Sequence, residues 1–290
     1  MCETCGCNRE EAYQVHAGAA GPDRPEGHHA AFHVHRSADG RAHVHAHSHD
    51  LGGTEHASGG AGPGGRTLDV NRSILGANDR AAEQNRGFFR ASKVRVINLL
   101  SSPGAGKTEL LARTLKDMKD GPRMAVIVGD LATENDAERL RGYGAQVVQI
   151  TTGTLCHLDA TMVMTAVEAL DLAEVDLLFI ENVGNLVCPS SFDLGESTRV
   201  VLLSVTEGED KPLKYPPIFK GADVILVTKT DLAEAAGYDR ALGLENLTRV
   251  APQARILEVS ARNGAGLESW NAFLAAQLEE AGHRPGVAGP

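Results

Sequence analysis

The sequence has few aromatic residues, no dense group of basic residues and no long hydrophobic run. Aromatic residues make up 4% of the 290-residue chain, and its formal net charge is -10. A nucleic-acid-binding protein needs a basic surface and aromatic stacking platforms, so we expect no nucleic-acid partner. No segment approaches the roughly 18 consecutive apolar residues of a membrane helix, and the N-terminus does not read as a signal peptide. We therefore expect a cytoplasmic protein with no membrane partner.

Cysteine is also scarce, and its distribution is uneven. Three of the five cysteines are Cys2, Cys5 and Cys7, a spacing that in a reducing compartment indicates metal ligation more than disulfides. With the α-amine of Cys2, the three thiolates suit Zn²⁺ in a tetrahedral site or Ni²⁺ in a square plane. A redox Cys-x-x-Cys motif is the alternative, but no βαβ pattern surrounds it.

Residues 1–66 contain too few large apolar side chains to bury a core, and we predict that they form a flexible tail and linker. Ten of the 12 histidines are in this segment: His16, His28, His29, His33, His35, His43, His45, His47, His49 and His56. Imidazoles at this density offer many interchangeable sites for Ni²⁺, Cu²⁺ or Zn²⁺, which favours a buffering or storage role. The alternative is a low-complexity tail with incidental metal affinity.

Residues 67–290 have the composition of a globular domain, which begins with a predicted helix at 68–90. Seven Val/Ile/Leu-rich runs follow, at 94–100, 124–128, 146–150, 175–180, 200–205, 224–227 and 256–259. None alternates strictly, and helical patterns lie between most of them, as expected of strands buried on both faces. The sequence therefore predicts an α/β fold with a doubly wound, mostly parallel seven-stranded sheet.

A phosphate-binding loop follows the first of these strands. Residues 101–108 read Ser-Ser-Pro-Gly-Ala-Gly-Lys-Thr and open a helical pattern, which is the context that a P-loop requires. Lys107 would neutralise the β and γ phosphates, and Thr108 would offer its hydroxyl to Mg²⁺. Ser101 replaces the usual first glycine, and an ordinary glycine-rich turn is the alternative. The predicted phosphate-binding residues are Gly104, Ala105, Gly106, Lys107 and Thr108.

A second motif indicates which base is bound. Thr228-Lys229-Thr230-Asp231 follows a strand and resembles the Asn-Lys-x-Asp signature, in which the aspartate accepts two hydrogen bonds that guanine can donate and adenine cannot. Lys229 would lie along the base. Ser260 and Ala261 resemble the loop whose backbone donates to guanine O6. A surface Lys/Asp turn is the alternative, but together with the P-loop the motif predicts GTP and GDP as ligands.

The hydrolytic centre is predicted around the strand that ends at Glu181. Glu181-Asn182-Val183-Gly184-Asn185 takes the place of the Asp-x-x-Gly switch, so that the Gly184 N–H would donate to the γ-phosphate and Glu181 would hold Mg²⁺ through water. No glutamine follows the glycine. Asp130, which ends another strand, is our candidate for orienting water or Mg²⁺. The alternative role for Asp130 is to cap a helix.

Two further cysteines lie in the predicted domain, beside His157. Cys156 directly precedes His157, and Cys188 follows the predicted switch. Buried cysteines in a cytosolic domain usually serve as small hydrophobic side chains. A metal held by Cys188 would, however, be tied mechanically to a loop that senses the γ-phosphate.

These motifs in this order resemble the HypB family, GTPases of the SIMIBI class that help to insert nickel into [NiFe] hydrogenase. The resemblance covers nearly the whole chain, including the Asn-Asp-Arg-Ala-Ala-Glu-Gln-Asn-Arg run at 78–86. It implies a homodimer, with a HypA-type nickel chaperone and a hydrogenase large-subunit precursor as partners. Because the sequence offers neither a switch glutamine nor an obvious arginine finger, we expect slow GTP hydrolysis. The resemblance also implies a tight nickel site and a second site that bridges two subunits. The first comprises Cys2, Cys5 and Cys7, and the second Cys156, His157 and Cys188.

Two other functions stay open from the sequence. One is a related chaperone GTPase for urease or a cobalamin-dependent mutase, which the N-terminal cysteine motif disfavours. The other is a nickel storage protein whose nucleotide domain only regulates release. Ligand chemistry alone does not choose between Ni²⁺ and Zn²⁺ at either cysteine site.

Overall fold

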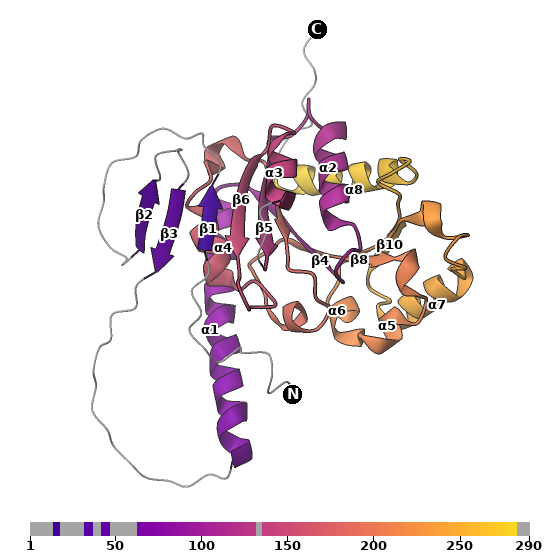
Figure 1. The fold of residues 1–290 in the computed structure, drawn as a ribbon, viewed down its shortest axis with the longest axis horizontal. Coiled ribbons are helices and arrows are strands. Elements are labelled where there is room, and N and C mark those ends of the chain that lie inside the picture. Colours follow the sequence, from indigo (N-terminus) through magenta and orange to yellow (C-terminus); the bar gives the residue numbers. More distant parts are fainter. Residues whose placement is uncertain (1–13, 18–31, 37–41, 47–62, 132–134, 283–290) are drawn as a thin grey trace.

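A computed structural model describes residues 14–17, 32–36, 42–46, 63–131 and 135–282 of the chain. Seven parallel strands form one continuous part of the sheet, which starts at the edge strand β10 and has the order β10-β9-β8-β4-β7-β5-β6 (Figure 1). Their bounds are Arg95–Ser101 (β4), Met124–Asp130 (β5), Gln146–Thr151 (β6), Leu177–Glu181 (β7), Thr198–Ser204 (β8), Val224–Thr228 (β9) and Arg255–Glu258 (β10). Each of the seven apolar runs forms a strand, which confirms the doubly wound fold.

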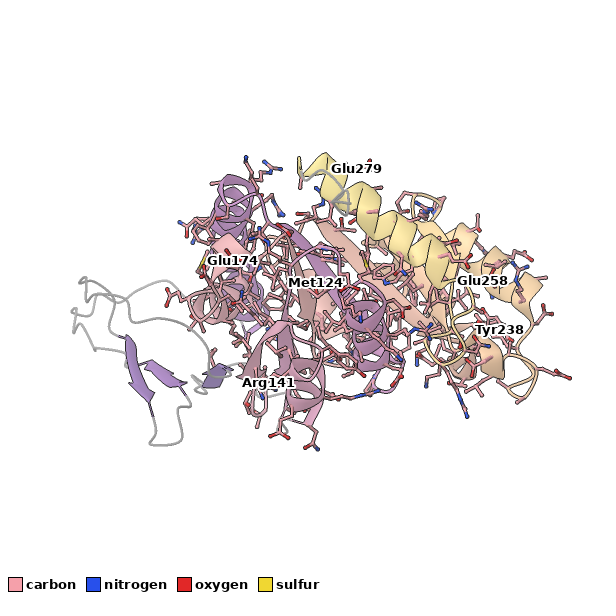
Figure 2. The ribbon with its side chains drawn as sticks, turned by 90° about the horizontal axis from the view of Figure 1, so that it is seen from above. Met124, Arg141, Glu174, Tyr238, Glu258 and Glu279 are labelled. Atoms are coloured by element: carbon pink, nitrogen blue, oxygen red, sulfur yellow. The ribbon has the colours of Figure 1, made fainter. Side chains whose placement is uncertain are left out.

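Helices cover both faces of this sheet, which is why its strands lack alternation. The core on one face includes residues of α2 (Lys107–Asp117), α3 (Asn135–Arg141) and α8 (Leu267–Glu280), and side chains fill the space beneath α8 (Figure 2). The cores on the other face include residues of α1 (Pro63–Ala91), α4 (Ala160–Val167), α6 (Pro216–Lys220) and α7 (Arg240–Val250).

Short helical turns complete the connections between strands. Their bounds are Leu172–Glu174 (η1), Cys188–Ser191 (η2), Val205–Glu207 (η3), Lys211–Lys214 (α5) and Thr230–Leu232 (η4). Four of them, η2, η3, α5 and η4, follow the carboxyl ends of parallel strands, where ligands bind in open α/β sheets. Within the described part of the chain, no helix combines the length and apolar character needed to cross a membrane.

Three short strands extend the sheet beyond β6 and form antiparallel pairs. They are β1 (Gln14–Ala17), β3 (Ala42–Ala46) and β2 (Phe32–Arg36), added in that order. The sequence predicted flexible tail here, but the same histidine runs alternate with apolar residues, and alternation is the period of a strand. The first long helix also starts earlier than expected, at Pro63, because proline suits the first turn. The domain division at residue 66 stays a prediction.

Buried asparagines fasten α1 to the rest of the domain. The Asn85 side-chain amide donates to the carbonyls of Ala160 at 2.8 Å and Leu194 at 3.0 Å. Gly195 follows with a φ of 86°, and a Cβ at this position would lie 2.6 Å from the Asn85 Cβ. The close approach therefore requires glycine, and it seals Asn85 against solvent.

Replacing Asn85 with alanine should lower the free energy of unfolding by about 2–4 kcal/mol, because two buried carbonyls lose their donor. Chemical denaturation followed by circular dichroism measures this loss. Gln84→Ala is the matched control, since Gln84 is the exposed neighbour on the same helix. Equal stability of the two variants would show that the Asn85 hydrogen bonds do not hold α1 in place.

Candidate functional site

The loop of residues 101–108 joins β4 to α2 with the shape of a phosphate cradle. Gly104 and Gly106 have φ angles of 72° and 99°, in the left-handed region that favours glycine. Gly106 directly precedes Lys107, the first residue of α2. The unpaired N–H groups of the first helical turn are therefore next to the loop, as in anion-binding helix N-termini.

Lys107 is a buried cation at the base of this loop. Its Nζ donates to the Ser101 Oγ at 2.9 Å, so the serine that replaces the usual first glycine holds the lysine in place. Burial lowers the pKa of Lys107, while the carboxylates of Glu181, Asp136, Glu207 and Asp130 oppose this shift. The ammonium group at the base of the loop is a buried positive charge with which an anionic ligand that enters the loop can pair.

Thr108 and Glu181 are hydrogen-bonded to each other close to Lys107. The Thr108 hydroxyl donates to the Glu181 Oε1 at 2.8 Å. The second carboxylate oxygen, Oε2, is buried without a hydrogen-bond partner. Burial raises the pKa of Glu181 to about 7, although Lys107 and Thr108 stabilise the charged form. Mg²⁺ prefers hydroxyl, carboxylate and water oxygens, so the unpaired oxygen fits the predicted magnesium site.

Asp130 ends β5 at the same edge of the sheet. Its Oδ1 accepts a hydrogen bond from the Leu131 N–H at 2.6 Å, and its charge acts on the pKa values of both Lys107 and Glu181. The next helix, α3, begins at Asn135, so Asp130 does not stand at its N-cap. The structure therefore brings Asp130 into the electrostatic surroundings of the cradle.

The segment 181–185 connects the cradle with the Cys156 loop. A Cβ on Gly184 would lie 2.9 Å from the Pro103 Cα, so only glycine fits against the P-loop. On the other side, the Asn182 Oδ1 accepts from the Leu158 N–H at 3.3 Å. The Asn185 amide donates to the Cys156 carbonyl at 3.5 Å. A displacement of this segment would therefore act on both loops.

The residues that were predicted to recognise the base lie against the same cradle. The Thr228 hydroxyl, buried at the end of β9, donates to the Ala105 carbonyl at 2.8 Å. Lys229 Nζ donates to the Gly104 carbonyl at 2.6 Å. Thr228 thus provides the tether between base loop and phosphate loop at the position where the signature has asparagine.

The Asp231 carboxylate is held in place by the last predicted loop. Its Oδ1 accepts from the Ser260 hydroxyl at 2.5 Å. The neighbouring Ala261 carbonyl accepts from Arg113 of α2 at 3.2 Å, which places this loop beside the phosphate-binding helix. Sequence reasoning found Asp231, Ser260 and Ala261 but missed Arg113, because nothing in its local sequence distinguishes it from a solvated helical arginine.

The structure places His157 beside the short helix that Cys188 begins. The Cys156 Sγ lies 4.0 Å from the His157 Nδ1, and both cysteines are partly buried and unbridged. Phe192, which follows η2, stacks on the His157 ring at a centroid distance of 3.9 Å. Burial lowers the pKa of His157, with Asp159 opposing, and this favours the neutral imidazole that can ligate a metal.

These side chains do not form a complete metal site within one described chain. Among the residues that the structure describes, no three His, Cys, Asp or Glu side chains converge as ligands. Cys2, Cys5 and Cys7 lie outside the described residues. Of the tail histidines, His33 pairs with His45 and His35 with His43 across β2 and β3. Directly paired residues belong to the same face of a sheet.

Glu207 is a contact of the cradle that sequence reasoning missed. Its Oε2 accepts from the Ser102 hydroxyl and lies 3.4 Å from Lys211 Nζ. Its Oε1 accepts from the Ser204 N–H, which completes a capping box at η3. The Ser-x-x-Glu spacing signals such a cap. This spacing does not indicate that the Glu207 carboxylate also contacts the phosphate loop.

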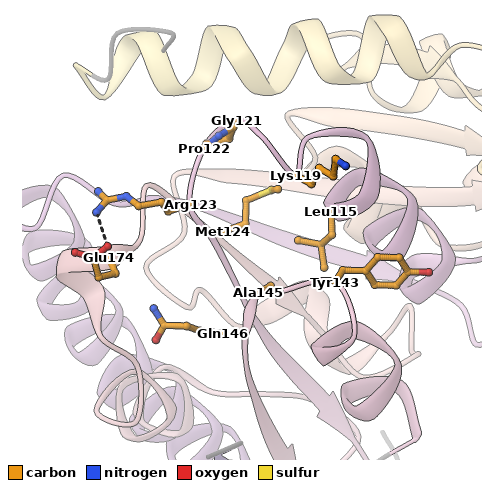
Figure 3. A pocket seen from close by; sticks show the side chains of 11 residues that line it. Leu115, Lys119, Gly121, Pro122, Arg123, Met124, Tyr143, Ala145, Gln146 and Glu174 are labelled. Atoms are coloured by element: carbon orange, nitrogen blue, oxygen red, sulfur yellow. Dashed lines mark hydrogen bonds and ion pairs between the residues drawn. The ribbon is translucent and has the colours of Figure 1, made fainter. Parts of the chain in front are cut away.

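A separate pocket of about 320 Å³ lies at the opposite edge of the sheet (Figure 3). It is lined by the starts of β5 and β6, and Arg123 and Glu174 form an ion pair of 3.1 Å at its rim. None of the predicted site residues lines it. The candidate site is therefore the carboxyl edge of the sheet, where the cradle and the cysteine loops meet.

Comparisons with known proteins show which family the chain is similar to. The family described as CobW/HypB/UreG, nucleotide-binding domain, matches residues 95–258. The hydrogenase maturation factor HypB of Rhizobium leguminosarum is 51% identical over 209 residues, which cover 72% of this chain and 70% of that protein. The hydrogenase/urease maturation factor HypB of Helicobacter pylori is 40% identical over 219 residues, covering 74% of this chain and 90% of that protein.

Two solved structures are similar over most of their own length. The crystal structure of Helicobacter pylori HypB in complex with nickel has a TM-score of 0.67 and 41% identity, covering 70% of this chain and 96% of that one. The crystal structure of Archaeoglobus fulgidus HypB has a TM-score of 0.66 and 41% identity, covering 70% of this chain and 99% of that one.

Removing the Thr228 hydroxyl should weaken nucleotide binding by about fivefold, the equivalent of one net hydrogen bond of about 1 kcal/mol. Thr228→Ala frees the Ala105 carbonyl and loosens the cradle, whereas Thr228→Ser keeps the donor. Titration with a fluorescent GDP analogue compares the two variants. If Thr228→Ala bound GDP as tightly as Thr228→Ser, the tether would have no role in affinity.

Proposed function

Because the chain belongs to the HypB family, we propose that it is a GTP-hydrolysing nickel chaperone that assists the insertion of nickel into [NiFe] hydrogenase. The observation that carries the proposal is the segment 181–185, which contacts the phosphate cradle through Gly184 and the Cys156 loop through Asn185. One segment can therefore report the nucleotide state to candidate metal ligands.

The nucleotide half of the proposal depends on complementary charge and hydrogen bonding. GTP binds with its phosphates in the loop of residues 101–108, where Lys107 exchanges the Ser101 hydroxyl for phosphate oxygens. Asp231, which Ser260 orients, accepts hydrogen bonds from the guanine edge. Adenine lacks these donors and would leave the carboxylate unpaired, so guanine is selected.

Hydrolysis needs a positioned water and stabilisation of negative charge. Thr108 and Glu181 would hold Mg²⁺, which when bound supplies positive charge to the β and γ phosphate oxygens. Lys107 stabilises the same oxygens from the base of the cradle. Asp130 orients the attacking water. The Gly184 N–H donates to the γ-phosphate, so that loss of this phosphate on hydrolysis releases the 181–185 segment.

The proposed nickel binding depends on the preference of the transported nickel ion for thiolate and imidazole ligands. Cys2, Cys5 and Cys7 form the first site, and Cys156, His157 and Cys188 the second. Since the described residues of one chain do not complete the second site, two protomers share the ion across a two-fold axis. The arrangement of the 181–185 segment in the GTP-bound state favours this dimer. Hydrolysis of GTP separates the two protomers, so that nickel passes to the hydrogenase precursor. A HypA-type chaperone is the expected partner in this step.

Replacing Lys107 with alanine should abolish GTP hydrolysis while nickel binding by the tail persists, because the two depend on separate ligands. The unmodified protein should hydrolyse GTP slowly, at about 10⁻⁴ to 10⁻² s⁻¹, since it has neither a switch glutamine nor an evident arginine finger. Phosphate release and equilibrium dialysis with nickel measure the two activities. Turnover of several per second without a partner, or loss of both activities in the variant, would contradict the proposal.

Replacing Cys188 with alanine should remove nucleotide-dependent nickel binding. We expect the unmodified protein to bind nickel at the second site more tightly with a non-hydrolysable GTP analogue than with GDP, because the analogue orders the 181–185 segment. Parallel titrations with nickel and zinc, with either nucleotide, measure this difference and the metal preference. Cys188→Ala should retain tail binding that is equal in the two nucleotide states. If nickel binding by Cys188→Ala still depended on the nucleotide, the nucleotide-sensitive nickel site would not include Cys188.

A further inference from the structure

A row of four polar side chains leads from the 181–185 segment to the turn η2. Its members are, in order, Asn182, Asn98, Glu196 and Arg199, and we call them the polar row. The Asn182 Nδ2 donates to the Asn98 Oδ1 at 3.4 Å, and the Asn98 Nδ2 donates to the Glu196 Oε1 at 3.2 Å. Arg199 Nε donates to the same Glu196 oxygen at 2.9 Å. Hydrogen bonds are therefore continuous from Asn182 to Arg199.

Strand pairing and burial hold the polar row together. Asn98 of β4 pairs directly with Arg199 of β8, so both belong to the same face of the sheet. Asn98 is 0% exposed, Asn182 1% and Glu196 8%. A buried amide or carboxylate that loses its partner is destabilised, so a shift of Asn182 favours a matching shift of its neighbours in the row.

The guanidinium group of Arg199 holds the turn that Cys188 begins. Its Nη1 donates to the Ser190 carbonyl at 3.4 Å, and its Nη2 donates to the Phe192 carbonyl at 3.0 Å. Because a guanidinium is planar and its donors are fixed, it sets the position of both carbonyls. The ring of Phe192 in turn stacks on His157. Arg199 therefore positions both the turn of Cys188 and the residue that covers His157.

The other end of the polar row lies beside the candidate ligands of magnesium and nickel. Asn182 directly follows Glu181, the predicted ligand of Mg²⁺. The Asn182 Oδ1 accepts from the Leu158 N–H at 3.3 Å, next to two of the candidate nickel ligands. One side chain thus contacts the loop of two candidate ligands directly and is connected through the row to the turn of the third, Cys188.

Cys188 lies between two attachments of its turn. Before it, the chain continues from the 181–185 segment, and the Asn185 Oδ1 accepts from the Val187 N–H at 2.8 Å. After it, Arg199 holds the carbonyls of the turn. Val187 is 60% exposed, so packing contributes little to fixing the chain next to Cys188. The position of the Cys188 thiol therefore depends on polar contacts at both ends of the turn.

We propose that Arg199 is a positioning residue for Cys188, and that the polar row transmits a shift of the 181–185 segment to the turn. The thiolate that it positions is a ligand for a soft divalent cation. The roles of Cys188 in nickel binding and of the segment in sensing nucleotide rest on the proposed function. The row itself rests on the hydrogen bonds and burial of its four side chains.

Alkylation of Cys188 tests the polar row in the full-length chain without metal or nucleotide. Cys188 remains as the reactive thiol when the other cysteines are changed to serine, namely Cys2, Cys5, Cys7 and Cys156. The rate of reaction with iodoacetamide reports how well the turn shields this sulfur, which is partly buried. Arg199→Gln should raise the rate about fivefold, the effect of losing one net hydrogen bond. Arg199→Lys keeps a cation with three donors and should react at the unmodified rate.

Asn98→Ser distinguishes the polar row from a purely local brace at Arg199. It removes an amide that is bonded to Asn182 and Glu196, two steps away from the turn. The rate should rise by a similar factor, and the double variant with Arg199→Gln should react no faster than either single variant, because both changes break one continuous row. An unmodified rate in Asn98→Ser, or effects that multiply in the double variant, would overturn the proposal.

Two further variants separate the polar row from a general loss of stability. Arg123→Gln is the matched control, because Arg123 also joins a carboxylate to a backbone carbonyl: it pairs with Asp176 at 2.6 Å and donates to the Ala173 carbonyl at 2.9 Å. Its rate should be unmodified. Glu196→Gln keeps the side-chain volume and weakens the centre of the row, so it should raise the rate even if Asn98→Ser does not fold. An equal rise in Arg123→Gln, or none in Glu196→Gln, would also overturn the proposal.

Adding nucleotide separates this proposal from the proposed function. With the row intact, the rate of alkylation should differ between GDP and a non-hydrolysable GTP analogue, and Arg199→Gln and Asn98→Ser should remove most of this difference. A difference of unchanged size in Asn98→Ser would overturn the row and leave the proposed function standing. If the nucleotide had no effect in the protein with an intact row, the proposed function would fail, while the nucleotide-free rates would still decide whether the row holds the turn.

Discussion

The buried pair of Lys107 and Glu181 is the constraint on which the rest of the site depends. A cation and a carboxylate, both removed from solvent, lie at the base of one loop, and one carboxylate oxygen has no partner. Burying such groups is costly unless they are compensated. Ser101 and Thr108 supply neutral hydrogen bonds, while phosphate and a divalent cation would supply full charges. The site is therefore organised around ligands with charges opposite to those of its own side chains.

This electrostatic centre restricts the shape of the segment that follows Glu181. Gly184 lies too close to Pro103 for a side chain, and Asn182 and Asn185 hold the loop that carries Cys156. Because packed segments shift between discrete arrangements and do not deform continuously, the proposed function requires only that a change at the γ-phosphate displaces this segment against the Cys156 loop. In the proposed function, a few short-range hydrogen bonds would couple nucleotide binding to metal binding.

The sheet itself was predictable because its signals are local. Each buried strand is a continuous apolar run, and the P-loop combines a strand, two left-handed glycines and a helix start within a few residues. The Thr228 to Asp231 motif was likewise recognisable from its spacing. The roles of Glu207 and Arg113 were not, because each depends on a partner about 100 residues or more away. The alternating histidines were interpreted as metal ligands alone, although the same alternation is the period of β2 and β3.

The sequence by itself determined the fold class and predicted the nucleotide-binding loop and the metal ligands, because residue type and short spacing specify these features. Only the tertiary structure decided how they are arranged relative to one another. Thr228 replaces asparagine as a tether because β9 ends beside Ala105, and β1 pairs with β6 because β6 is the last strand of the parallel part of the sheet. Both outcomes depend on which strands are neighbours in the sheet. Strand order is set by long-range packing, which no local pattern encodes.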